Sequence, residues 1–145
     1  MGKLDTTTMM NETNYIKIYE TEKFIIGHVF ESAYLTDIAT GQTILIGDFY
    51  GNPSCGLISN DNKWCLVSGS TLRLWTGNEV YEIKDDKLYW ACKLRQTGAE
   101  KVEILVDPWA DNSSVWEFNI RTRESRKIKD FDNYKDKEFT DNIEW

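Results

Sequence analysis

The sequence predicts an all-β domain of antiparallel strands, and three observations lead to that prediction. Apolar and polar side chains alternate along most segments; Ile16 and Ile18, for example, point one way and Lys17 the other. Gly, Asn and Asp separate these segments at short intervals, as in Gly77-Asn78. No window keeps apolar residues at helical spacing over about ten residues, so we expect no helix of ordinary length.

About a dozen runs of β-branched and aromatic residues form the expected strands. In chain order they cover residues 15–19, 24–30, 34–38, 43–48, 56–59, 64–68, 71–75, 79–83, 88–94, 101–107, 115–120 and 125–128. The short turns between them favour antiparallel pairing of consecutive strands. Residues 1–14 lack periodicity and are expected to form a flexible tail before a single all-β domain at residues 15–145. The polar stretch at residues 132–142 is expected to be irregular.

Residues 55–83, with the sequence CGLISNDNKWCLVSGSTLRLWTGNEVYEI, resemble one blade of a WD-repeat type β-propeller. Two shorter fragments, residues 34–46 and 115–128, are similar to the last hairpin of such a blade. The resemblance touches half of the chain and implies four-stranded antiparallel meanders. The family's Gly-His pair is absent, and Trp75-Thr76 and Trp116-Glu117 stand in place of its Trp-Asp dipeptide.

Chain length limits how far this resemblance extends. Closing a propeller takes at least four blades of roughly 40 residues, and a chain of 145 residues has room for about three. The expected architecture is therefore a set of antiparallel meanders that form a propeller-like rolled sheet or a two-sheet sandwich, not a complete propeller. Assembly with a second chain that supplies the missing blades is the remaining alternative.

The charge balance favours a basic partner. The chain carries 17 Lys and Arg against 24 Asp and Glu, a formal net charge of −7, which disfavours binding to nucleic-acid phosphates or to anionic lipid. The basic segment at residues 121–129 is followed by an acidic stretch at residues 130–144. We expect that stretch to cancel much of the basic field within a Debye length of about 10 Å.

The residues predict no catalytic or cofactor site. His28, the single histidine, shares a strand face with Phe24 and Ile26 and is expected to be a hydrogen-bonded core residue. Most aspartates occupy turns, where they bond the backbone. One histidine and three scattered cysteines leave no metal-ligand spacing, and no glycine-rich motif opens a helix that could hold phosphate. Cysteines without a disulfide pattern, and no apolar run of roughly 18 residues, favour a cytoplasmic protein.

Two loops combine aromatic and acidic side chains and are the predicted binding sites. The first, residues 47–53, has two adjacent aromatics that enter a Gly/Pro turn, and the second, residues 107–112, is stiffened by Pro108. Aromatic and acidic groups together suit the basic surface of a protein partner. Folding of the Trp109 ring back onto the core is the competing interpretation. The candidate residues are Asp48, Phe49, Tyr50, Asp107, Trp109 and Asp111.

Three functions are consistent with these features. The favoured one is a non-enzymatic, acidic protein-binding domain, specifically an immunity protein or antitoxin that masks a basic toxin domain such as a nuclease. The segments Gly-Asp-Phe-Tyr-Gly-Asn-Pro and Trp-Cys are similar to those of bacterial proteins from toxin–immunity loci. A propeller-like scaffold module or homo-oligomer is the alternative, and a β-sandwich that binds a small ligand among its six Trp residues is the third.

Overall fold

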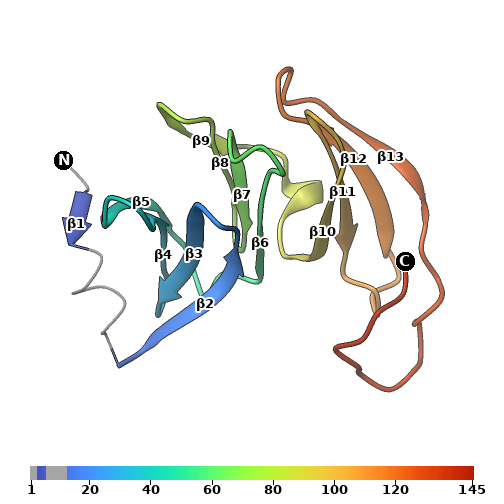
Figure 1. The fold of residues 1–145 in the computed structure, drawn as a ribbon. Coiled ribbons are helices and arrows are strands. Elements are labelled where there is room, and N and C mark those ends of the chain that lie inside the picture. Colours follow the sequence, from blue (N-terminus) through green and yellow to red (C-terminus); the bar gives the residue numbers. More distant parts are fainter. Residues whose placement is uncertain (1–2, 6–12) are drawn as a thin grey trace.

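The computed structural model describes residues 3–5 and 13–145, and within them the chain is all-β, as the sequence predicts (Figure 1). Three antiparallel sheets follow one another along the chain, and none closes into a barrel. The first contains β2 (Tyr15–Glu20), β3 (Phe24–Val29), β4 (Ser32–Asp37) and β5 (Gln42–Asp48). The second contains β6 (Cys55–Ile58), β7 (Cys65–Ser68), β8 (Leu72–Trp75) and β9 (Val80–Ile83). The third contains β10 (Ala91–Gly98), β11 (Lys101–Val106), β12 (Ser114–Asn119) and β13 (Ser125–Asp130).

Each sheet is a simple meander in which consecutive strands pair with each other. Every predicted strand therefore has a counterpart, and the prediction of antiparallel meanders that do not complete a propeller is confirmed. Within the expected tail at residues 1–14, β1 (Lys3–Asp5) pairs antiparallel with β5 as a fifth strand of the first sheet. The rest of that tail lies outside the described residues, apart from the turn at Thr13 and Asn14.

β6 lies between β2 and β10, so one edge strand of each sheet contributes to a common inner edge along which the sheets align. Two side chains tie β10 to the start of β6. The Ser54 hydroxyl donates to the carbonyl of Ala91 at 2.8 Å, and the Cys55 thiol donates to the same oxygen at 3.2 Å. The backbone amide of Asn60 donates to the Gln96 side chain at 2.8 Å beyond the other end of β6.

Apolar side chains fill both spaces between the sheets. Between the first and second sheets, the rings of Phe24 and Trp75 meet edge to face at 5.3 Å, and Ile26 and Val67 are fully buried. Between the second and third, the Trp64 indole donates to the carbonyl of Ala99 at 3.0 Å. Sheets stacked through alternate side chains explain why β-branched and aromatic residues dominate the strands.

The segment after β13 covers the outer face of the third sheet. Its residues 131–145 contain turns and no regular element, as expected for the polar stretch at 132–142. Phe131 is buried against Leu105 and Val115, and Tyr134, Ile143 and Trp145 pack beside it. The guanidinium of Arg95 lies 4.0 Å from the Trp145 ring centroid and donates to the Trp145 carbonyl at 2.9 Å. The segment therefore shields an apolar sheet face from water.

One predicted strand begins later than expected. Residues 88–94 read as a strand, but Leu88 belongs to a 3-10 turn, η1 (Asp86–Leu88), and β10 starts at Ala91. The Asp85 side chain caps this turn by accepting from the Lys87 amide at 3.2 Å. Leu88 is fully buried in the core between the second and third sheets, so an inter-sheet contact rather than strand pairing fixes its conformation.

Candidate functional site

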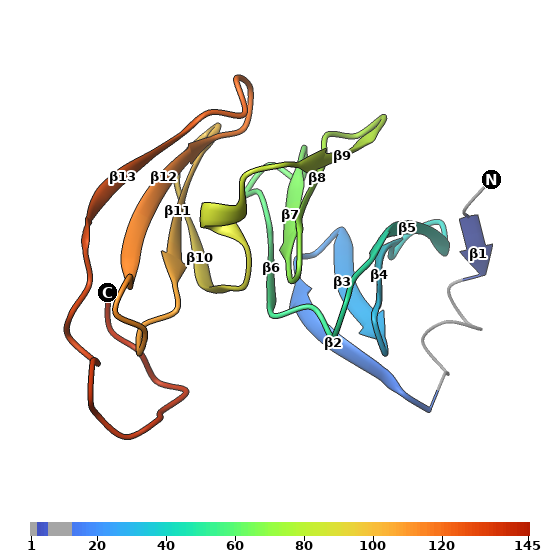
Figure 2. The same cartoon turned by 180° about the vertical axis from the view of Figure 1, so that it is seen from behind.

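Four connections meet along one edge of the molecule, the lower edge in Figure 1, and the reverse view in Figure 2 shows the same grouping. They are the turn between β3 and β4, the link from β5 to β6, the residues between η1 and β10, and the loop from β11 to β12. Each connection directly follows a strand or turn whose side chains are buried between the sheets. The edge is therefore a rigid support for exposed side chains.

Large aromatic side chains are exposed along this edge. Tyr50 is 87% exposed, Phe139 74%, Phe30 63% and Trp90 47%. We call the group the loop-end surface and define it by these aromatics with the acidic residues beside them: Phe30, Glu31, Asp48, Tyr50, Trp90, Asp107 and Phe139. Isolated exposed apolar residues are normal on any protein, but several gathered on neighbouring loops indicate an interaction site.

Hydrogen bonds between the loops hold this surface together. The Gly51 amide donates to the Glu31 carboxylate at 2.6 Å, and the Tyr50 amide donates to the Ser70 hydroxyl at 2.8 Å. The Trp90 amide donates to the carbonyl of Gly69 at 2.8 Å. A methyl group built on Gly51 would lie 3.3 Å from the Trp90 ring, so those two loops are in close approach. The first, second and third sheets thus contribute to one continuous surface.

Three residues of the loop-end surface have left-handed backbone conformations. The φ angles are 50° at Phe30, 56° at Trp90 and 32° at Asp107. Phe30 occupies the first position of the two-residue turn between Val29 and Ser32, where glycine is the usual residue. Such conformations cost about 1 kcal/mol or more for a bulky residue and concentrate at functional sites. Two of the exposed aromatic side chains, Phe30 and Trp90, are therefore presented by strained backbone.

His28 hydrogen-bonds to the turn that carries Phe30. It is buried in β3, and its Nδ1 lies 2.7 Å from the carbonyl oxygen of Phe30. Because a carbonyl only accepts, Nδ1 carries the proton and donates. The prediction that His28 is a hydrogen-bonded core residue is confirmed, and the bond helps to hold the strained turn that presents Phe30.

The predicted binding residues of the first loop separate by exposure. Tyr50 points to solvent, and Asp48 is exposed and accepts from the Ser32 hydroxyl at 2.5 Å. Phe49 is only 6% exposed and packs in the core, where the Arg73 guanidinium lies 5.9 Å from its ring centroid. This loop therefore offers Asp48 and Tyr50 to a partner, whereas Phe49 anchors the loop.

The predicted residues of the second loop are also divided. Trp109 is half-buried between Tyr134 and Phe139, with ring centroids 6.1 Å and 5.1 Å apart. Its indole Nε1–H is buried without a hydrogen-bond partner among the described residues. Asp107 is exposed in the loop-end surface, and Asp111 is exposed in an ion pair with Lys135 at 3.3 Å. Asp107 and Trp109 line one pocket with Trp90, and the Trp90 ring in turn lies close to Gly51 of the first loop. The structure thus brings Asp107 and Trp109 near that loop.

A pocket of about 340 Å³ opens beside Trp90. Trp90, Trp109 and Phe139 provide aromatic walls, and Ile143 adds an aliphatic one. The charged side chains that line it are Asp107, Asp141 and Lys93. Burial raises the pKa of the Cys92 thiol in this wall, and the carboxylates of Asp107 and Asp141 raise it further against the opposing effect of Lys93. The pocket is aromatic and carries one more negative than positive charge.

Sequence reasoning missed Phe30, Trp90 and Phe139. Phe30 and Trp90 were assigned to strands, and Phe139 to a polar tail. A signal for Phe30 was present, because a two-residue hairpin turn without Gly or Asn is unusual. No local pattern marks Phe139, since its place depends on stacking against Trp109 thirty residues earlier in the chain.

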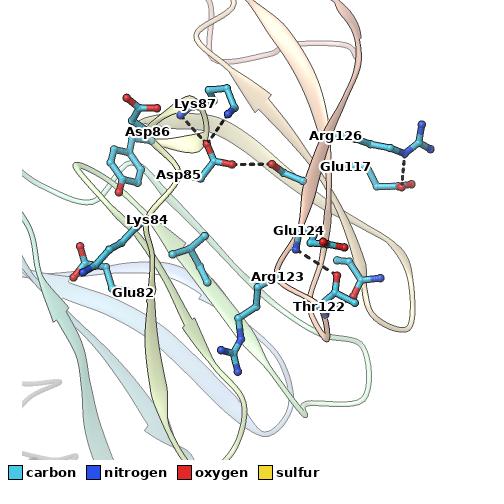
Figure 3. Close-up of a pocket in the computed structure, with 14 residues that line it drawn as sticks. Glu82, Lys84, Asp85, Asp86, Lys87, Glu117, Thr122, Arg123, Glu124 and Arg126 are labelled. Atoms are coloured by element: carbon cyan, nitrogen blue, oxygen red, sulfur yellow. Dashed lines mark hydrogen bonds and ion pairs between the residues drawn. The ribbon is translucent and has the colours of Figure 1, made fainter.

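A second depression, of about 1360 Å³, lies at the opposite edge between the second and third sheets. Figure 3 shows acidic and basic side chains alternating around it, from Glu82 and Lys84 to Glu117 and Arg126. Ser125 donates to the Asp85 carboxylate at 2.8 Å, and the Arg123 guanidinium lies 3.7 Å from the Tyr81 ring centroid. These two contacts bridge the sheets, whereas Glu117 and Arg126 pair with each other within the third sheet.

The basic hairpin at residues 121–129 finds its partners across the sheet. Arg126 pairs with Glu117 at 3.2 Å and Arg121 with Glu100 at 3.4 Å. Lys127 pairs with Asp130, the first residue of the acidic stretch. Two carboxylates outside the acidic stretch, Glu117 and Glu100, therefore neutralise part of this hairpin together with Asp130.

The thiols are poorly suited to nucleophilic chemistry. Burial raises the pKa of both Cys55 and Cys65 to about 12, so both remain protonated near neutral pH. Among the described residues, no three His, Cys, Asp or Glu side chains gather as a metal site requires. The described part of the chain also contains no helix of the length and apolarity needed to cross a membrane.

No protein-family model matches the chain, and a search of curated proteins finds no match.

Proposed function

We propose that this chain is a non-enzymatic, acidic protein-binding domain that docks a basic protein on the loop-end surface. The observation that carries the proposal is the gathering of four exposed aromatic side chains on loops at one edge. Aromatic residues supply much of the binding energy at protein interfaces when a partner excludes water from them. Tyr50 and Phe30, as the most exposed members from the sheet loops, are the expected anchors.

The backbone geometry supports the same proposal. Phe30 and Trp90 hold left-handed conformations that glycine would adopt without strain. A strained aromatic at a loop tip destabilises the free protein and is retained where the side chain has a task. An exposed ring contributes little to the stability of the free protein. Contact with a partner would account for both the exposure of the rings and the strain of their backbone.

Charge supports a basic partner. The loop-end surface carries Glu31, Asp48 and Asp107, on a chain of net charge −7. A field of one sign accelerates encounter with an oppositely charged protein and disfavours acidic ones. The partner that fits is a basic domain such as a nuclease toxin, and the chain would then act as its immunity protein by covering the basic surface.

The scaffold and homo-oligomer alternative receives less support from the packing. A second copy that extended the stack beyond the third sheet would need its outer face, but Phe131, Tyr134 and Trp145 already cover that face. Light scattering of the purified protein tests this alternative, because a ring of copies would give a multiple of the mass of 16.9 kDa.

Co-expression with the product of the adjacent gene tests the proposed function. We expect a basic product that elutes together with this chain as a stable complex. The variants Phe30→Asn and Tyr50→Ser should lose the complex, since they remove exposed rings. The variant Ile38→Ser serves as a control because Ile38 is 42% exposed but follows β4 at the end opposite to the Phe30 turn. Equal binding by all three variants, or no complex with the original chain, would reject the proposal.

A further inference from the structure

We propose that the pocket beside Trp90 takes a cationic side chain, arginine or lysine, from the partner segment that covers the loop-end surface. The inference deepens the proposed function and rests on it, because it names the chemical group that anchors the partner.

The walls of the pocket suit a cation. Trp90 and Trp109 come from different loops, and Phe139 closes a third side. Indole and phenyl faces attract cations through the negative potential above the ring, and groups of such rings recognise ammonium and guanidinium ions. An apolar side chain would also contact these rings, so the aromatic walls alone do not decide the sign of the charge.

The carboxylates in the pocket favour a positively charged ligand. Asp107 and Asp141 both line the pocket, and among the described residues Lys93 is the only basic side chain in its lining. A cationic group held between aromatic faces and a carboxylate gains charge-assisted hydrogen bonds in addition to the ring contact. An anionic ligand would meet the same two carboxylates, and a neutral ligand would leave the excess negative charge of the pocket uncompensated.

Size and position fit a single side chain rather than a large ligand. The volume of about 340 Å³ is at the lower end of the range of small-molecule pockets. Trp90 lines the pocket, and its ring approaches Gly51 in the loop that carries Tyr50. A partner segment lying across Tyr50 could therefore insert one long side chain beside Trp90 without leaving the surface.

The test uses the full chain and three small molecules: N-acetyl-arginine amide, N-acetyl-lysine amide and N-acetyl-norleucine amide as the neutral control. The indole N–H signals of the six Trp residues are followed by NMR during titration. We expect saturable shifts of the Trp90 and Trp109 signals with at least one cationic amide and none with norleucine. Equal responses to cationic and neutral amides, or no response to the cations, would overturn the inference.

Matched variants locate the site. Asp107→Asn with Asp141→Asn should weaken binding of the cationic amide by about tenfold, because both carboxylates are lost while asparagine still tolerates the φ of Asp107. Asp111→Asn is the control, since Asp111 lies on the same loop but does not line the pocket. Unchanged NMR spectra elsewhere confirm folding. Equal affinity in the double variant and the control would place the cation elsewhere.

The proposed protein-binding function and the proposed cation pocket can be rejected independently. Amide binding without a copurifying protein would leave the pocket in place and remove the proposed partner. A protein complex that needs Tyr50 but survives the double aspartate variant, with no amide binding, would keep the proposed function and remove the cation pocket.

Discussion

The Gly51 amide donates to the Glu31 carboxylate at 2.6 Å, which joins the link between the first two sheets to the turn that presents Phe30. Neighbouring bonds from Phe49 to the Glu31 carbonyl and from Tyr50 to Ser70 extend the connection. The loops that present Phe30 and Tyr50 are therefore held by the same group of hydrogen bonds. This coupling makes the surface preformed, which lowers the entropy cost of binding.

Replacing Glu31 should loosen that support locally. In Glu31→Ala the Gly51 amide loses its acceptor, and we expect its hydrogen exchange to accelerate, with global stability falling by about 0.5–1.5 kcal/mol. Glu31→Gln keeps an acceptor oxygen and is expected to retain most of the protection. Hydrogen exchange of the Gly51 amide measures the effect, and unchanged exchange in Glu31→Ala would argue against the bond as the link between the loops.

Phe30→Gly should separate stability from binding. Phe30 is mostly exposed and has a φ of 50°, so glycine relieves strain and loses little packing. We expect the free energy of unfolding to remain equal or to rise by about 1 kcal/mol, while partner binding falls. Urea unfolding measures the first quantity. A marked loss of stability would show that the ring packs in the free protein and is not held for a partner.

Phe131 and Phe139 should differ in their contribution to stability, although both lie in the segment after β13. Phe131 is buried against the third sheet, so Phe131→Ala should cost about 3–5 kcal/mol. Phe139 is 74% exposed, and Phe139→Ala should change stability by less than about 0.5 kcal/mol while weakening the cation pocket. Similar losses in the two variants would contradict the assignment of Phe131 as the anchor of this segment.

Thiol reactivity should report the folded state. Because the pKa of Cys55 and of Cys65 rises to about 12, neither should react with a thiol reagent at pH 8 until denaturant is added. At pH values above 9.0, the pKa of an unfolded cysteine thiol, the folded protein keeps protons on these two thiols that the unfolded chain releases. Stability is therefore expected to fall as pH rises from about 9 toward 12. Rapid labelling of Cys65 in the native protein would contradict its burial.

The strands were predictable because alternation and turn residues are local signals. Ile16, Lys17 and Ile18 lie in β2, and Gly77-Asn78 lies in the connection between β8 and β9. The predicted alternation in β2 is wrong in detail, because a register shift between Lys17 and Tyr19 leaves Ile16 55% exposed while Ile18 packs against the core. Leu88 was placed in a strand because an apolar residue gives the same local signal in a strand and in a buried 3-10 turn. Only its contact between two sheets distinguishes the two.

The candidate surface was predictable only in part. Tyr50 and Asp107 lie in loops that combine aromatic and acidic residues, a pattern visible along the chain. Phe30, Trp90 and Phe139 join them through the stacking of the three sheets and through the docking of the last segment, which depend on contacts between distant residues. The burial of Phe49 beside the exposed Tyr50 follows from the direction in which β5 enters the core.

Site-specific photo-crosslinking in the source cells tests the central claim most directly. A benzophenone amino acid replaces Phe30 or Tyr50 in the loop-end surface, and Ile38 or Ile128 at exposed positions outside it. The account predicts that positions 30 and 50 crosslink to the same basic protein and that positions 38 and 128 do not. Crosslinks of equal yield at all four positions, or none at positions 30 and 50, would contradict a binding role for this surface.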